Sequence, residues 1–341
     1  MHNGAGDVDA RVTSTFRLLS DVEHYWFAPG RCGVCDKLKP MTPLTGKPVC
    51  CAPVGDRCGE GVLWHPAEEA VYWTDITRFL IHRFDPATAA VKSWFFDEPV
   101  TAVLLTTLNH VLAVCLGSRV ILWEPATDAR RDQGFQLPNW PLVRLNDAAV
   151  DPRGSLWVGS MRNNVNADGS DGEAGGTDGS LFRIDPNGQV TEVEAGIGIA
   201  NTLAWSPDQE IFYFADTLVN TIWAYDYDNQ TGSIHKTGNH LADFSRGLPD
   251  GSTIDADGFV WNCRWDGACI VRVAPAGAVD SVIEMPTRNI TNCTFGGKDL
   301  DTLYVTSAAS PADKGDRLAG GLFAVKTNLR GLPENRFHLQ D

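Results

Sequence analysis

Four polar side chains that could ligate a metal ion stand at the start of short, apolar, strand-like segments spread over most of the chain. They are Glu60, Asn146, Asn201 and Asp250. Burying a carboxylate or an amide is costly unless it finds a partner, so these positions need a common explanation. Carboxylate and amide oxygens, with no histidine or cysteine among them, suit a hard divalent cation such as calcium, magnesium or manganese, and zinc or iron would be tolerated. The two acids together would balance the charge of one such ion.

A simpler explanation for asparagine and aspartate at the ends of strands is that they cap turns. It fits Asp151, Asp208 and Asp257, which lie in the turn-like sequences DPRG, SPDQ and DADG. It fits the four candidate ligands less well, because each of them occupies the same point of a repeated pattern.

The repeated pattern occurs six times. Each copy has a short strand opened by a polar or small residue, a turn, an aromatic-rich strand, a second turn and a third strand. The copies begin at Glu60, Thr101, Asn146, Asn201, Asp250 and Asn292, which are 41 to 55 residues apart. A period of this length built from short strands is typical of propeller blades. The longest interval contains a glycine- and aspartate-rich insertion at 163–179, which we interpret as a surface loop. The sequence therefore predicts an all-β, six-bladed β-propeller.

A propeller would bring the four candidate ligands together. The innermost strand of each blade lines a central channel and all six run in the same sense, so residues that begin these strands meet at one mouth. We therefore expect a central metal site. The segment 47–53 (KPVCCAP) precedes the first repeat and is suited to complete the last blade. This divides the chain into an N-terminal extension at 1–46 and a propeller domain at 47–341.

The composition excludes several classes of partner. The chain has 341 residues and a formal net charge of −15, and therefore lacks the basic surface that nucleic acid and anionic membranes require. No apolar run is long enough to span a bilayer, and the N-terminus lacks the pattern of a signal peptide, so we expect a cytoplasmic protein. Nothing in the sequence indicates the oligomeric state.

The nine cysteines are unevenly distributed, and five of them lie between Cys32 and Cys58. Their spacing matches no standard two-pair zinc pattern, and an odd number argues against a full set of disulfides. We expect buried free thiols, with a structural metal or a disulfide in this segment as the alternative.

Several ordered motifs resemble the successive blade motifs of the regucalcin/gluconolactonase (senescence marker protein) family. They are GEGVLWHP, RLNDAAVDPRGSLWVGSM, NTLAWSPD, LPDGSTIDADGFVWNC and TNCTFGG, and the resemblance extends from about residue 47 to 326. The family comprises six-bladed propellers that are metal-dependent sugar lactonases. The resemblance implies that Glu60, Asn201 and Asp250 are metal ligands. It also implies that Arg144 and Asn146 contact the substrate.

Two positions depart from the family pattern. Thr202 stands where the family usually has glycine after the asparagine, which could narrow the pocket or shift the local backbone. The region 159–164 reads GSMRNN and lacks a glutamate that some members have there. The resemblance therefore does not support substrate contact by Asn164.

The implied chemistry is hydrolysis of a sugar-derived lactone, such as an aldonolactone, to the corresponding acid. A divalent cation with open positions could act as a Lewis acid on the carbonyl and lower the pKa of a bound water. Asp250 could accept the proton of that water as general base. Arg144 and Asn146 would orient substrate oxygens, and Arg144 could stabilise the developing oxyanion. Each residue has its own alternative: Arg144 could belong to a surface ion pair, and Asn146 could be a fourth metal ligand, directly or through a water.

Two other functions stay open on the sequence. The same scaffold could be a non-catalytic calcium-binding or regulatory propeller, because a fold does not define a function. It could also be a lactonase or esterase with a larger, non-sugar substrate, although the polar pair Arg144 and Asn146 favours a polar one. A serine-nucleophile motif (G-x-S-x-G) and a zinc-protease motif (H-E-x-x-H) are both missing from the sequence.

Overall fold

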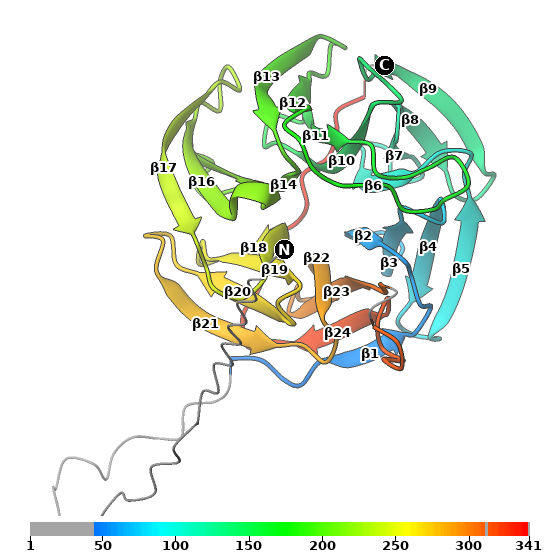
Figure 1. Ribbon diagram of the computed structural model, residues 1–341, viewed down its shortest axis with the longest axis vertical. Coiled ribbons are helices and arrows are strands. Elements are labelled where there is room, and N and C mark those ends of the chain that lie inside the picture. Colours follow the sequence, from blue (N-terminus) through cyan, green and yellow to red (C-terminus); the bar gives the residue numbers. More distant parts are fainter. Residues whose placement is uncertain (1–43, 311–312, 340–341) are drawn as a thin grey trace, which may run out of the picture. The chain divides into compact units, whose positions relative to one another are not determined.

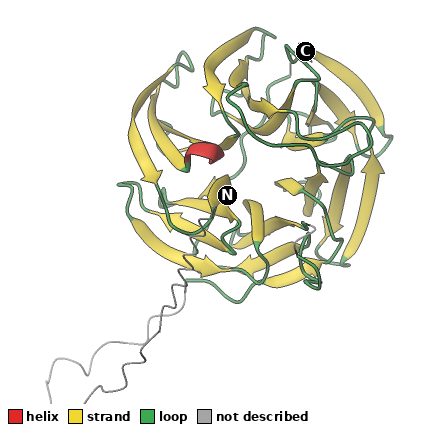
Figure 2. Cartoon of the chain, viewed as in Figure 1, coloured by secondary structure: helices red, strands yellow, loops and turns green. Residues whose placement is uncertain are grey.

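The structure, a computed structural model, describes residues 44–310 and 313–339 (Figure 1). Within them the chain forms six four-stranded antiparallel sheets, which are the blades of a β-propeller around a central channel. The predicted all-β, six-bladed architecture is confirmed. The one helical turn in these ranges is a short 3₁₀ helix, η2 (Thr217–Val219) (Figure 2). Among the described residues, no helix has the length and hydropathy that crossing a bilayer requires.

Each blade contributes one inner strand to the channel wall and three further strands outside it (Figure 1). The inner strands of blades 1 to 6 are β2 (Gly59–His65), β6 (Val100–Leu105), β10 (Val143–Val150), β14 (Ala200–Trp205), β18 (Leu248–Ile254) and β22 (Asn289–Gly296). The second strands are β3 (Ala70–Asp75), β7 (Leu112–Leu116), β11 (Leu156–Arg162), β15 (Ile211–Asp216), β19 (Val260–Trp265) and β23 (Thr302–Ala308). The third strands are β4 (Leu80–Asp85), β8 (Arg119–Glu124), β12 (Gly179–Ile184), β16 (Thr221–Tyr227), β20 (Cys269–Val273) and β24 (Leu322–Lys326). The outermost strands are β5 (Ala90–Phe95), β9 (Ala129–Gln136), β13 (Val190–Ile197), β17 (Ile234–Ala242), β21 (Val279–Glu284) and β1 (Val49–Ala52).

The ring is closed by the strand that comes first in the described chain. β1 pairs antiparallel with β24 and so completes blade 6, as expected for segment 47–53. Thr45 already bridges Thr327, and the Gly46 N–H donates to the Lys326 carbonyl at 2.7 Å. The division of the chain at residue 46 stays a prediction, because residues 1–43 lie outside the described residues.

Large side chains of the second strands fill the space between the blades. The completely buried ones include Trp73, Trp157, Phe212 and Trp261. The three tryptophans each donate the indole N–H to a buried aspartate at 2.6 to 2.9 Å. These hydrogen bonds satisfy a polar group that would otherwise be costly to bury. The accepting residues are Asp56, Asp151 and Asp255.

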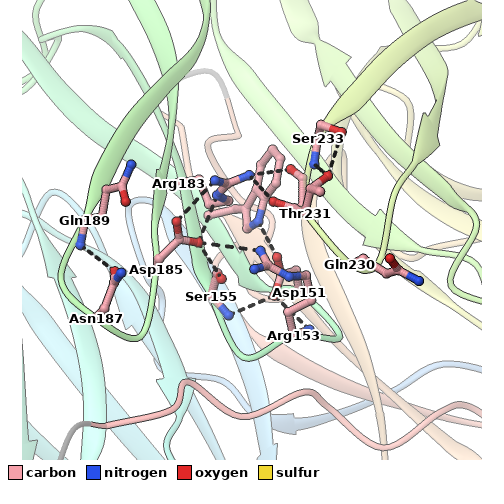
Figure 3. Close-up of polar contacts among 12 residues, drawn as sticks. Asp151, Arg153, Ser155, Arg183, Asp185, Asn187, Gln189, Gln230, Thr231 and Ser233 are labelled. Carbon is pink, nitrogen blue, oxygen red and sulfur yellow. Dashed lines mark hydrogen bonds and ion pairs between the residues drawn. The ribbon is translucent and has the colours of Figure 1, made fainter.

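A polar network joins the turns of blades 3 and 4 (Figure 3). Arg183 of β12 forms an ion pair with Asp185 at 2.9 Å and also donates to the Thr231 carbonyl at 3.2 Å, in the turn between β16 and β17. Ser155 donates to the same Asp185 carboxylate at 2.9 Å. Because these contacts join turns of neighbouring blades, we assign the network a structural role at the contact of blades 3 and 4.

The C-terminal segment crosses the end of the channel at which the inner strands finish, and it is visible behind the ring as the red trace in Figure 1. Gly331 forms a β-bridge with Asp255 of blade 5, and Phe337 forms one with Thr106 of blade 2. The Phe337 side chain is buried in the core between blades 2 and 3. The segment therefore covers the channel on the side opposite the predicted mouth.

The cysteines within the described ranges are free thiols. Cys50, Cys51 and Cys58 are half-buried, and the remaining four are buried in the blades. Cys32 and Cys35 lie outside the described residues, so the alternative of a metal or disulfide in that segment stays a prediction.

His240 of β17 is a buried base with an unsatisfied nitrogen. Its ring packs on Tyr213 with the ring centroids 4.5 Å apart, and its Nε2 has no hydrogen-bond partner among the described residues. Burial lowers the pKa of His240 from 6.5 to about 4. Between these two values the unfolded chain binds a proton that the folded protein does not, so lowering the pH favours unfolding.

We expect His240 to make the folded state lose about 2 kcal/mol of stability between pH 7.5 and pH 5. The loss begins near the unfolded pKa of 6.5 and is complete below the folded value of about 4. Urea unfolding of the wild type and of His240→Leu at both pH values measures it, since leucine cannot titrate. Equal pH dependence of the two proteins would contradict the prediction.

Candidate functional site

A register irregularity near the start of every inner strand frees polar side chains from the usual alternation of a strand. In blades 1, 4 and 5 the pairing with the second strand shifts directly after Glu60, Asn201 and Pro249. Blades 3 and 6 shift after Leu145 and Ile290, and blade 2 has a similar shift. Such bulges bend a strand and re-aim its side chains. They explain why polar residues of different blades contact one another at the mouth of the channel.

Two carboxyl groups meet at this mouth. The carboxyl groups of Glu60 of β2 and Asp250 of β18 lie within hydrogen-bonding reach of each other, and both residues are buried, at 8% and 6% exposed. Glu60 Oε2 also accepts from the Gly61 N–H at 3.0 Å and from Asn292 Nδ2 at 3.1 Å. Two carboxyl groups can be this close only if they share a proton or a cation.

The electrostatics of the pair oppose two ionised carboxylates side by side. Burial raises the pKa of Glu60, and it raises the pKa of Asp250 well above its ordinary value, which the negative charge of Glu60 raises further. Both ionised forms are therefore unfavourable without a neighbouring positive charge. A divalent ion held by the two carboxylates would lower both pKa values, because its positive charge would stabilise both ionised forms.

Asn201 of β14 contributes a neutral amide oxygen to the same mouth. Its Nδ2 donates to Thr217 Oγ1 at 2.8 Å, and this hydroxyl donates to the Pro249 carbonyl at 2.8 Å. The amide is thereby held with Oδ1 towards Asn146, whose Nδ2 lies 3.3 Å away. Since Pro249 directly precedes Asp250, Asn201 is tied to the strand that carries one of the acids.

The residues present fit a cation with oxygen ligands. In the described part of the chain, no three Asp, Glu, His or Cys side chains are grouped closely enough to hold a metal by themselves. An ion at the mouth would therefore take carboxylate oxygens from Glu60 and Asp250 and an amide oxygen from Asn201. This donor set suits calcium, magnesium or manganese.

Arg144 of β10 is buried beside these residues and held in one orientation. Its Nη1 donates to the Leu145 carbonyl at 2.9 Å and to Asn146 Oδ1 at 2.7 Å. Nε and Nη2 donate to Asn164 Oδ1 at 3.0 and 2.8 Å. Four of the five N–H groups thus have partners within the described ranges, which leaves one for a bound molecule. Burial lowers the pKa of Arg144 to about 10, so the guanidinium stays charged at neutral pH.

The loop that carries Asn164 connects β11 with β12 and reaches from blade 3 to blade 1 (Figure 1). Val165 is buried in a small apolar cluster that includes Phe79 of blade 1. Arg57, just before β2, forms an ion pair with Asp171 of the loop at 2.9 Å. The predicted insertion is a loop, and these contacts hold it along the edge of the mouth.

A cavity of about 410 Å³ lies deeper in the channel. It is lined mainly by later residues of the inner strands and by the C-terminal segment at 332–335. Gly61, Asp147 and Asn292 also border it, whereas none of Glu60, Asn201 and Asp250 does. We therefore place the candidate site at the mouth and not in this cavity.

The five residues predicted from the sequence lie in one connected group at the mouth. They are Glu60, Arg144, Asn146, Asn201 and Asp250. The alternative of a surface ion pair for Arg144 is wrong, because its side chain is only 4% exposed and donates to amide and carbonyl oxygens. The oxygen of Asn146 accepts from Arg144, which favours its predicted substrate role over that of a ligand. The roles of all five stay predictions.

Sequence reasoning missed three polar residues of this group. Asn292 begins the sixth repeat, so its repeat position was the signal that could have identified it. Asp147 follows Asn146 directly; burial and the charge of Glu60 raise the pKa of Asp147 to about 8. Asn164 lies in the insertion, where the repeat gives no information, and its contact with Arg144 comes only from the path of the loop.

Comparison with known proteins gives relatives over most of the chain. Residues 58–309 match a family model described as the SMP-30/Gluconolactonase/LRE-like region. A pentonolactonase of Haloferax volcanii is 35% identical over 289 residues, which cover 82% of this chain and 94% of the relative. A 6-deoxy-6-sulfogluconolactonase of Pseudomonas putida is 32% identical over 292 residues, with 82% and 94% covered.

A solved structure of similar fold is the calcium-binding protein regucalcin of Agrobacterium tumefaciens. It matches with a TM-score of 0.79 and 25% sequence identity, covering 86% of this chain and 98% of its own. The match of the family model to more than half of the chain, together with the two lactonases, leads to one assignment. The chain belongs to the SMP-30/gluconolactonase/LRE-like family.

Proposed function

We propose that this protein hydrolyses a sugar-derived lactone, an aldonolactone, to the corresponding acid with the help of one divalent cation. The observation that carries the proposal is the buried pair of carboxyl groups of Glu60 and Asp250 at the channel mouth, next to the oriented guanidinium of Arg144. The names of the pentonolactonase and sulfogluconolactonase relatives support a lactone as substrate.

Glu60, Asn201 and Asp250 would hold the cation. When bound, it would polarise the lactone carbonyl and lower the pKa of a coordinated water. Asp250 would accept the proton of the attacking water, since a carboxylate at the mouth can serve as general base. Glu60 is better placed as a pure ligand, because the Gly61 N–H and Asn292 already donate to its Oε2.

Arg144 and Asn146 would bind the sugar. The free N–H of Arg144 can donate to the carbonyl oxygen as negative charge develops on it, and a donor that is already oriented needs no rearrangement in the transition state. Asn146 holds Arg144 and faces Asn201, so it lies between the predicted substrate and metal contacts. The polar character of both residues supports a hydroxylated substrate over a large apolar one.

A non-catalytic calcium-binding protein is the second candidate, because a calcium-binding regucalcin shares the fold. Such a protein would need the three oxygen ligands. It would not need a buried arginine with one N–H that is free to bind a substrate. The two candidates therefore differ in whether lactone hydrolysis accompanies cation binding.

The direct test measures acid release from xylonolactone and gluconolactone by the purified protein. We expect hydrolysis that a chelator abolishes and that Ca²⁺, Mn²⁺ or Zn²⁺ restores. Cation binding without hydrolysis of any aldonolactone in a broader panel would favour the regulatory candidate. A chelated protein that keeps its full rate would contradict the proposed role of the cation.

Asp250→Asn keeps an oxygen at the position of the ligand but removes the proton acceptor. We expect the hydrolysis rate to fall by about 100-fold or more, as for loss of a general base. Calorimetric titration with Mn²⁺ checks that the variant still binds the ion. Asp208→Asn, in an exposed turn, is the control and should keep the wild-type rate. A variant of Asp250 that binds the ion and stays fully active would rule out its role as base.

Asn164→Ala removes the oxygen that accepts two hydrogen bonds from Arg144. We expect kcat/KM to fall about 10-fold, mainly through a higher KM, because the guanidinium is no longer held in place. Asn164→Asp keeps an acceptor and should recover most of the activity. Asn166→Ala, at an exposed position of the same loop, should behave as the wild type. Equal kinetics for Asn164→Ala and the wild type would show that Arg144 needs no such support.

A further inference from the structure

Thr202 has a backbone conformation that a threonine rarely adopts. It follows Asn201 in β14 with a φ of 55°, in the left-handed region that favours glycine. Among the described non-glycine residues with positive φ, it is the one with a β-branched side chain. Its side chain is completely buried. A conformation this unfavourable persists only where the surrounding structure enforces it, and such positions cluster at functional sites.

At the equivalent position of blade 1 the chain has a glycine, which adopts this backbone conformation without strain. Gly61 follows Glu60 in β2, has a φ of 53°, and lies in the same kind of register shift. A Cβ at Gly61 would lie 3.0 Å from the Thr101 carbonyl oxygen and from Ala102 Cα of the next blade. The left-handed position therefore points a side chain at the neighbouring inner strand. Blade 1 has no side chain there, whereas blade 4 has a threonine.

The side chain of Thr202 points in this direction, and its hydroxyl contacts blade 5. Its Oγ1 donates to the backbone carbonyl of Asp250 at 2.6 Å and lies 2.9 Å from Ser252 Oγ. Asn262 of β19 donates from Nδ2 to the same Asp250 carbonyl at 3.1 Å and to Thr202 Oγ1 at 3.3 Å. The backbone carbonyl of Asp250 is thus held by a small buried network that begins in blade 4.

The backbone of Thr202 is held as well. Its N–H lies close enough to the carboxyl group of Asp147 in blade 3 to lower the pKa of that group. Thr202 lies in β14 directly beside Asn201 and therefore faces both neighbouring inner strands, β10 and β18. Thr217 links the Asn201 side chain to the Pro249 carbonyl, whereas Thr202 reaches the carbonyl of Asp250 itself.

We infer that Thr202 is a positioning residue that sets the spacing between Asn201 and Asp250, and that its hydroxyl increases the affinity of the mouth for a divalent cation. The inference rests on the proposed function, because it takes these two residues as ligands. The strained backbone is retained because glycine at this point could not bridge the blades. Thr202 touches neither cation nor substrate and acts through the strand that carries Asp250.

The test compares Thr202→Ser, Thr202→Ala and Thr202→Gly in the full chain, after chelator treatment, by calorimetric titration with Mn²⁺ and by thermal unfolding without metal. Serine keeps the hydroxyl and should bind Mn²⁺ within about threefold of the wild type. Alanine and glycine lose it and should bind about tenfold more weakly, as for loss of a group that orients a ligand. Glycine relieves the strained φ, so it should unfold at a higher temperature than alanine.

A purely structural role for the hydroxyl predicts a different result. The affinities for Mn²⁺ would then stay at the wild-type value in the alanine and glycine variants, whatever their melting temperatures, and the inference would be overturned. Thr106→Ala is the matched control, since Thr106 is a buried threonine at the far end of β6 whose hydroxyl also donates to backbone carbonyls. It should lower the melting temperature without changing the affinity.

The two proposals fail in distinguishable ways. If the wild type binds none of Mn²⁺, Ca²⁺ and Zn²⁺, the proposed cation site is wrong. If the wild type binds Mn²⁺ and Thr202→Gly binds it equally well, the cation site stands and only the role of Thr202 is wrong.

Discussion

The mouth of the channel is governed by one electrostatic constraint: two buried carboxyl groups, Glu60 and Asp250, lie within hydrogen-bond contact. Neighbouring carboxylates in a buried position are unfavourable unless a proton or a cation compensates them. Arg144 is the cationic side chain nearby, but it directs four of its N–H groups to neutral oxygens. The arrangement therefore makes sense for a protein that binds a positive ion between the two acids.

The propeller supplies this arrangement through repetition. Six inner strands run in the same sense, and each has a register irregularity near its start. Polar residues that are far apart in the sequence thereby meet at one end of the channel. The C-terminal segment crosses the other end of the channel, away from Asn201 and Asp250. Closure of the ring by β1 keeps blades 1 and 6, and with them Glu60 and Asn292, in contact.

The repeat made the fold and much of the site predictable, because every inner strand begins at the same point of it. The outermost strands of blades 1 to 5 were not predicted, unlike β1 of blade 6. For example, β9 and β17 are largely exposed and carry mostly polar residues, so no apolar alternation marks them. The contact between Arg144 and Asn164 could not be predicted from the sequence for a different reason, since it depends on the path of an irregular loop. The departure from glycine at Thr202 was visible in the sequence, but its meaning depends on a φ angle and on the carbonyl of Asp250.

The central claim is that side chains from blades 1, 4 and 5 hold a single divalent cation. Anomalous diffraction from crystals of the full chain soaked in Mn²⁺ tests it most directly. We expect one strong peak at the mouth, with carboxylate oxygens of Glu60 and Asp250 and the amide oxygen of Asn201 within about 2.5 Å of it. A crystal without a peak there, or with Mn²⁺ bound only elsewhere on the protein, would contradict the claim.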